Sequence, residues 1–137
     1  MAWKIFDAVN NVGTSNIIDW IQKEKITKND VARLNQKIDM LERNGTEFHP
    51  KLVAGPIKSE RKPKSPRHIY KLRIRGDREL RPLFCKGPLD MDDEFTLLLG
   101  AIEVGDVLDT DALDAEAVRQ AVIKHPNRWR KPHERYS

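Results

Sequence analysis

Apolar and polar residues along the first fifty positions predict one strand followed by two amphipathic helices. Residues 3–9 alternate loosely and lead into a turn-like segment, which predicts a short first strand. Ser15 and Thr27 precede runs with helical spacing and are suited to cap two helices. The second helix has an apolar face made of Val31, Leu34, Ile38 and Leu41. It should end at Asn44 and Gly45, which tolerate a left-handed conformation.

The second half of the chain predicts an antiparallel three-strand meander and a last helix. In the first strand Tyr70, Leu72 and Ile74 should face one side, with Lys71, Arg73 and Arg75 on the other. The second strand contains Pro82, which indicates a bulge or an edge. The apolar run 95–104 should be the most buried strand. The helix should start near Asp109 or Asp111 and be closed by Pro126.

These elements predict an α+β fold, with an N-terminal strand, a helical hairpin, the meander and a C-terminal helix. The length of 137 residues suits a single domain spanning 1–137. Segment 58–67 has almost no apolar residues and is expected to be a mobile basic loop. Residues 127–137 form a basic tail, in which Tyr136 is expected to be disordered.

Composition narrows the class of protein. No run approaches the ~18 apolar residues that a membrane span requires, and the first residues lack the pattern of a signal peptide. We therefore expect a cytoplasmic protein without a membrane partner. The single cysteine, Cys85, excludes an internal disulfide and a multi-cysteine zinc site, and we expect no metal and no cofactor.

Charge is strongly segregated along the chain. Residues 51–81 contain eleven Lys and Arg against three Asp and Glu, whereas residues 82–116 contain one against ten. Residues 117–137 are basic again, with six Lys and Arg against one Glu. A basic surface of this kind is suited to phosphates, because Lys and Arg contacts dominate nucleic-acid affinity. Ordinary solvated surface is the alternative interpretation.

The hairpin sequence 69–84, IYKLRIRGDRELRPLF, resembles the central hairpin of RelE/HigB-type toxins of bacterial toxin–antitoxin systems, including phage-derived relatives. The segment 51–55, KLVAG, resembles the family's segment before that hairpin, and 95–100 resembles the strand after it. The resemblance implies a RelE-like fold, similar to small microbial ribonucleases. It also implies a ribosome-dependent endoribonuclease that cleaves messenger RNA without metal, and a cognate antitoxin as partner.

Metal-free cleavage of RNA requires removal of the 2′-hydroxyl proton, stabilisation of the charged phosphate and protonation of the leaving oxygen. By position in the resembled motif, Lys71 is the general-base candidate, Arg73 the second strand cation and Arg81 the transition-state-stabilising arginine. We expect four further cations to hold RNA: Lys51, Arg67, Arg75 and Arg78.

Two departures from the family pattern leave other functions open. The place of the family's basic pair after the third strand is acidic here, at Glu103 and Asp106, and the first candidate for a C-terminal acid is His125. The chain could therefore be a non-catalytic protein of the same fold that inhibits a host protein or serves a phage. It could also be a plain nucleic-acid-binding module. Codon preference, oligomeric state and host are not indicated by the sequence.

Overall fold

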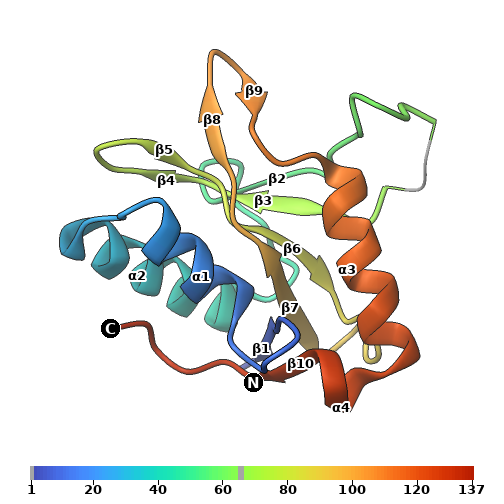
Figure 1. Ribbon diagram of the computed structural model, residues 1–137. Coiled ribbons are helices and arrows are strands. Elements are labelled where there is room, and N and C mark those ends of the chain that lie inside the picture. Colours follow the sequence, from blue (N-terminus) through green and yellow to red (C-terminus); the bar gives the residue numbers. More distant parts are fainter. Residues whose placement is uncertain (1, 65–66) are drawn as a thin grey trace.

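The computed structural model describes residues 2–64 and 67–137, which form an α+β fold with two sheets (Figure 1). The helices are α1 (Asn16–Lys23), α2 (Lys28–Asn44), α3 (Ala112–Lys124) and α4 (Pro126–Trp129). The strands are β1 (Lys4–Ala8), β2 (Val53–Ala54), β3 (Tyr70–Leu72), β4 (Ile74–Arg75), β5 (Glu79–Leu80), β6 (Leu83–Lys86), β7 (Glu94–Leu99), β8 (Ile102–Val104), β9 (Val107–Leu108) and β10 (Arg130–Pro132).

The larger sheet has six strands in the order β10-β1-β7-β6-β3-β2, and the smaller has four in the order β4-β5-β8-β9. Only the β1–β7 pair is parallel among the strand pairs of the described residues. The N-terminal strand β1 is thus second from one edge of the larger sheet, between the last meander strand and the tail strand β10.

The predicted three-strand meander is present, and each of its strands contributes to both sheets. The first is interrupted at Arg73, the second at Arg81 and Pro82, and the third at Gly100 and Ala101. Pro82 has no backbone N–H, so a break at that position costs no ladder hydrogen bond. The β4–β5 hairpin and the β8–β9 hairpin consequently project away from the larger sheet (Figure 1).

The helices α1, α2 and α3 begin at or next to the caps that the sequence predicts, whereas the short helix α4 was not predicted. The Ser15 hydroxyl accepts from the Ile18 amide, and Thr27 accepts from the Asp30 amide. Gly45 ends α2 with a φ of 57°, and a Cβ there would lie 2.2 Å from Nε1 of Trp3. Side-chain caps satisfy backbone N–H groups that a helix leaves without partners.

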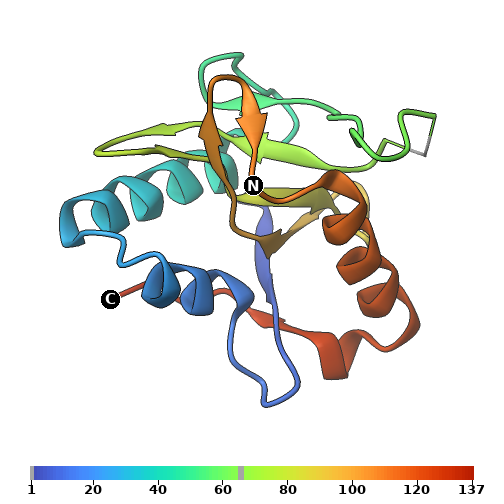
Figure 2. The same ribbon diagram turned by 45° about the horizontal axis from the view of Figure 1, so that its top comes forward.

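Two apolar clusters hold three layers together, with the α1–α2 pair on one side of the strands and α3 on the other (Figure 2). Neighbouring strand residues alternate between them: Phe84 and Leu97 pack toward α1 and α2, whereas Cys85 and Leu98 pack toward α3. This is the alternation expected of strands buried on both faces.

Two sequence-based expectations are wrong. Residues 95–104 do not form one buried strand, because the chain bends at Gly100, where a Cβ would lie 1.9 Å from the Trp20 ring. Beyond the bend Val104 is 75% exposed. Tyr136 is not disordered: it is 6% exposed, and its hydroxyl donates to Asp7 at 2.7 Å.

Part of the predicted basic loop is attached to the N-terminus of α3. Residues 65 and 66 of that loop lie outside the described residues. In the described part, Ser59 donates to the Asp111 carboxylate at 2.6 Å, and Arg61 pairs with Asp114 at 2.7 Å. Among the described residues, no helix is long and apolar enough to span a membrane.

Candidate nucleic-acid interface

The alternation predicted for the first meander strand is confirmed. Leu72 and Ile74 are fully buried, whereas Arg73 and Arg75 are exposed and Lys71 is partly buried. The inward residues join the cluster under α1 and α2, so the three cations extend from the opposite face.

A carboxylate from β8 joins two of the cations predicted to be catalytic. Glu103 accepts from Lys71 Nζ at 2.9 Å and 3.2 Å, one contact to each carboxylate oxygen. It also accepts from Nε of Arg81 at 2.8 Å. The side chains of all three are largely buried, so these are charge-assisted contacts with little competition from water. The acidic stretch that departs from the family pattern is therefore part of the cluster.

Arg81 bridges two carboxylates that would otherwise repel each other. Glu79 and Glu103 lie opposite each other in the register of β5 and β8. The Arg81 guanidinium donates to Glu79 at 2.6 Å and to Glu103 at 2.8 Å, and a further N–H donates to the Leu80 carbonyl at 2.9 Å. Like charges opposite each other destabilise a sheet, and this arginine compensates both.

The charge of Glu103 follows from its surroundings. Burial alone would raise the pKa of this carboxyl group. Hydrogen bonds from Lys71 and Arg81, together with their positive charges, outweigh burial and hold the pKa below the ordinary glutamate value. Glu103 is thus ionised at neutral pH.

The cluster opens into a hollow of about 460 Å³, which we call the Glu103 hollow. It is lined by Lys71, Arg73, Arg75, Glu79, Arg81, Glu103, Gly105 and Asp106. The three residues predicted to be catalytic therefore line one concavity. Cations and carboxylates are mixed in it, so it can move a proton as well as hold a phosphate.

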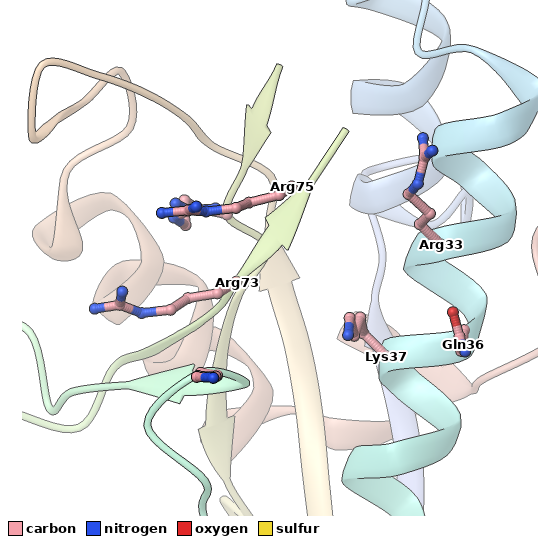
Figure 3. Close-up of a pocket in the computed structure, with 7 residues that line it drawn as sticks. Arg33, Gln36, Lys37, Arg73 and Arg75 are labelled. Atoms are coloured by element: carbon pink, nitrogen blue, oxygen red, sulfur yellow. The ribbon is translucent and has the colours of Figure 1, made fainter. Parts of the chain in front are cut away.

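A second hollow of about 510 Å³, which we call the basic groove, lies between α2 and β4 (Figure 3). It is lined by Arg33, Gln36, Lys37, Lys51, Arg73, Arg75 and Arg81, six cations and one amide. Arg73 and Arg75 extend together from the strand on the side away from α2, and Lys37 and Arg33 lie on α2 on the other side of that strand (Figure 3). Arg73, Arg75 and Arg81 line both hollows, which therefore adjoin.

The four residues predicted to hold RNA are not all in one place. Lys51 and Arg75 line the basic groove. Arg67 lines a separate hollow that reaches Lys71 from the α3 side. Arg78 contacts the end of α1, where it donates to the side chain and the backbone carbonyl of Glu24.

The helix α2 supplies functional candidates that the sequence analysis missed, at Arg33, Gln36 and Lys37. Their spacing places them on one face of a helix, and this was the only indication in the sequence. That face could not be assigned to a groove without knowing which strand lies beside it.

The remaining candidates lie elsewhere. His125 is the C-cap of α3, and the C-terminal end of that helix lies away from β8 and β9 (Figure 1). Tyr136 donates to Asp7 from a buried position and cannot serve the cluster as an acid. Burial raises the pKa of the Cys85 thiol to about 12. The described part of the chain has no group of three or more His, Cys, Asp or Glu side chains placed to hold a metal.

No family model matches the chain, and searches of curated proteins and of solved structures found no match.

Proposed function

We propose that the chain is an endoribonuclease of the RelE/HigB toxin type, which cleaves messenger RNA at the ribosome without a metal ion. The observation that carries the proposal is the Glu103 carboxylate, held by Lys71 and Arg81 in a hollow that also contains Arg73. The RelE-like arrangement and a cognate antitoxin belong to the same proposal, through the resemblance of the hairpin.

The cluster supplies the groups that the reaction needs. An ionised Glu103 can accept the proton of a 2′-hydroxyl, whose oxygen then attacks the adjacent phosphorus. The 5′-oxygen leaves and takes a proton, so the products are a 2′,3′-cyclic phosphate and a 5′-hydroxyl. Lys71 lies beside Glu103 and can supply that proton, while Arg73 is exposed and can stabilise the extra negative charge on the phosphate.

These contacts change two of the roles expected from the motif. We assign the role of base to Glu103 in place of Lys71, because the Glu103 carboxylate is ionised and lines the hollow beside the Lys71 amine. Arg81 has its donors engaged by Glu79, Glu103 and backbone carbonyls. We therefore assign Arg81 the role of a positioning residue that orients the base.

Expression in bacteria tests the proposal. Inducing the wild-type chain should arrest growth and cleave ribosome-bound messenger RNA, leaving 2′,3′-cyclic phosphate ends. Glu103→Gln removes the base but keeps the shape, and it should slow cleavage by about 10²-fold or more. The matched control is Glu47→Gln, at an exposed glutamate outside both hollows, which should arrest growth like the wild type. Harmless expression with intact messenger RNA would sink the proposal.

A non-catalytic protein of the same fold is the second candidate, as an inhibitor of a host protein or as a nucleic-acid-binding module. Glu103 neutralises Lys71 and Arg81 in part, so the hollow attracts phosphate less than three free cations would. Growth arrest with uncleaved messenger RNA, unaffected by Glu103→Gln, would support this candidate.

A further inference from the structure

We infer that the basic groove is a binding track for the phosphate backbone of single-stranded RNA, and that it holds the strand whose linkage lies in the Glu103 hollow. The identity of the ligand as RNA rests on the proposed function. The new element is the binding surface itself, which includes the face of α2 that carries Arg33, Gln36 and Lys37.

The two hollows differ in how far their cations are compensated by carboxylates. Three carboxylates line the Glu103 hollow, whereas no carboxylate lines the basic groove in the described part of the chain. In residues 2–64 and 67–137, Lys37, Lys51 and Arg73 make no ion pair. Cations gathered around one opening repel each other, and an anionic ligand that spans them relieves this repulsion.

The groove also leads to the place where the chemistry is proposed. Arg73, Arg75 and Arg81 line both hollows, so a strand bound along α2 can pass from Lys37 to the Glu103 hollow without leaving cationic surface. A ligand with one phosphate would not use both places. A polynucleotide presents a phosphate at every nucleotide and can occupy both.

Gln36 suits RNA in particular. It is the single uncharged residue that lines the groove, and its amide offers both a donor and an acceptor. A 2′-hydroxyl is likewise both donor and acceptor, and it is the group that distinguishes RNA from DNA. The groove should therefore bind RNA more tightly than DNA of the same sequence, and Gln36→Ala should reduce that preference.

The groove has a purely structural alternative. The strand β4 is the edge of the smaller sheet, and charged side chains on an edge strand prevent pairing with other molecules. A protective role requires no particular ligand. It predicts that neutral variants bind RNA like the wild type and associate with one another.

Binding of a labelled single-stranded RNA of about 12 nucleotides, followed by fluorescence anisotropy at several salt concentrations, tests the inference. Each of Lys37→Gln and Lys51→Gln should weaken binding about fivefold at 0.1 M salt and reduce the salt slope by about 0.7, the value for one lost phosphate contact. The control is Lys124→Gln, at the exposed end of α3, which should bind like the wild type.

The outcomes separate this inference from the proposed function. If Lys37→Gln and Lys51→Gln bind RNA with wild-type affinity, the inference that the basic groove binds RNA is overturned, even if the wild type cleaves RNA. Loss of affinity for RNA in both variants would support binding of RNA by the basic groove, even if the wild type does not cleave RNA. Because an acidic protein segment could also use these cations, equal loss of affinity for polyglutamate and for RNA would overturn the assignment to RNA.

Discussion

At the scale of single residues, Arg81 does the most to hold the site in shape. Its side chain is 7% exposed and donates to two carboxylates and to backbone carbonyls of the smaller sheet. Removing one partner of a buried ion pair is costly because the other charge is left uncompensated. Loss of toxicity in an arginine variant at this position would therefore combine lost activity with lost stability.

Arg81→Ala should lower the free energy of unfolding by about 3 kcal/mol or more, since Glu79 and Glu103 would then face each other without the bridge. Arg73→Ala is the matched control, because it removes an exposed arginine from the same hollow and should change stability by about 0.5 kcal/mol at most. Urea unfolding of the purified proteins measures both values. Equal stability of the two variants would show that the bridge around Arg81 contributes nothing.

At the scale of elements, sequence patterns predicted the features that depend on residues close in the chain, and they missed the contacts between residues far apart in it. The caps at Ser15 and Thr27 and the alternation of residues 70–75 follow from side chains close in sequence, and they are confirmed. The sequence predicts a free tail, because no residue close to it in the chain indicates a contact that would order it. One of its partners is Asn35, whose amide accepts from the backbone N–H of Tyr136 and donates to its carbonyl.

Asn35→Ala should release the end of the tail, because both buried backbone groups of Tyr136 lose their partner. We expect a loss of about 2 kcal/mol in unfolding free energy. Hydrogen exchange should rise at residues 133–137 first, before it rises in β1. The control is Asn44→Ala at the end of α2, which leaves the tail contacts intact. Unchanged exchange at the tail in Asn35→Ala would contradict a docking role for this amide.

At the scale of the whole molecule, the fold brings the acidic segment 82–116 onto the basic segment 51–81. Glu103 pairs with Lys71 and Arg81, Asp114 pairs with Arg61, and Glu116 contacts His68. The segregation of charge along the chain predicted a basic surface. In the described part of the chain this surface is limited to the Lys and Arg side chains that do not pair with a carboxylate of the acidic segment. The sequence could not identify these unpaired cations, because the pairing of a cation with a carboxylate depends on which strands and helices become neighbours.

This pairing predicts a particular loss of stability in acid. For Glu103, Asp111 and Glu116, burial alone would raise the pKa. Hydrogen bonds outweigh the effect of burial, so each folded-state pKa is lowered. Glu103 accepts from Lys71 and Arg81. Asp111 accepts from Ser59 and backbone amides, and Glu116 accepts from Gln120, His68 and Arg119. Groups of this kind stabilise the fold above their unfolded pKa and lose that contribution as pH falls through the folded value.

The unfolding free energy should therefore stay level as pH falls from neutral toward the ordinary glutamate pKa of 4.5, and decline below it. The combined variant Glu103→Gln, Asp111→Asn and Glu116→Gln should be less stable at neutral pH and show a shallower decline in acid. Chemical denaturation at a series of pH values measures both curves. An equally steep decline in the combined variant would contradict a role for these three carboxylates in the acid sensitivity.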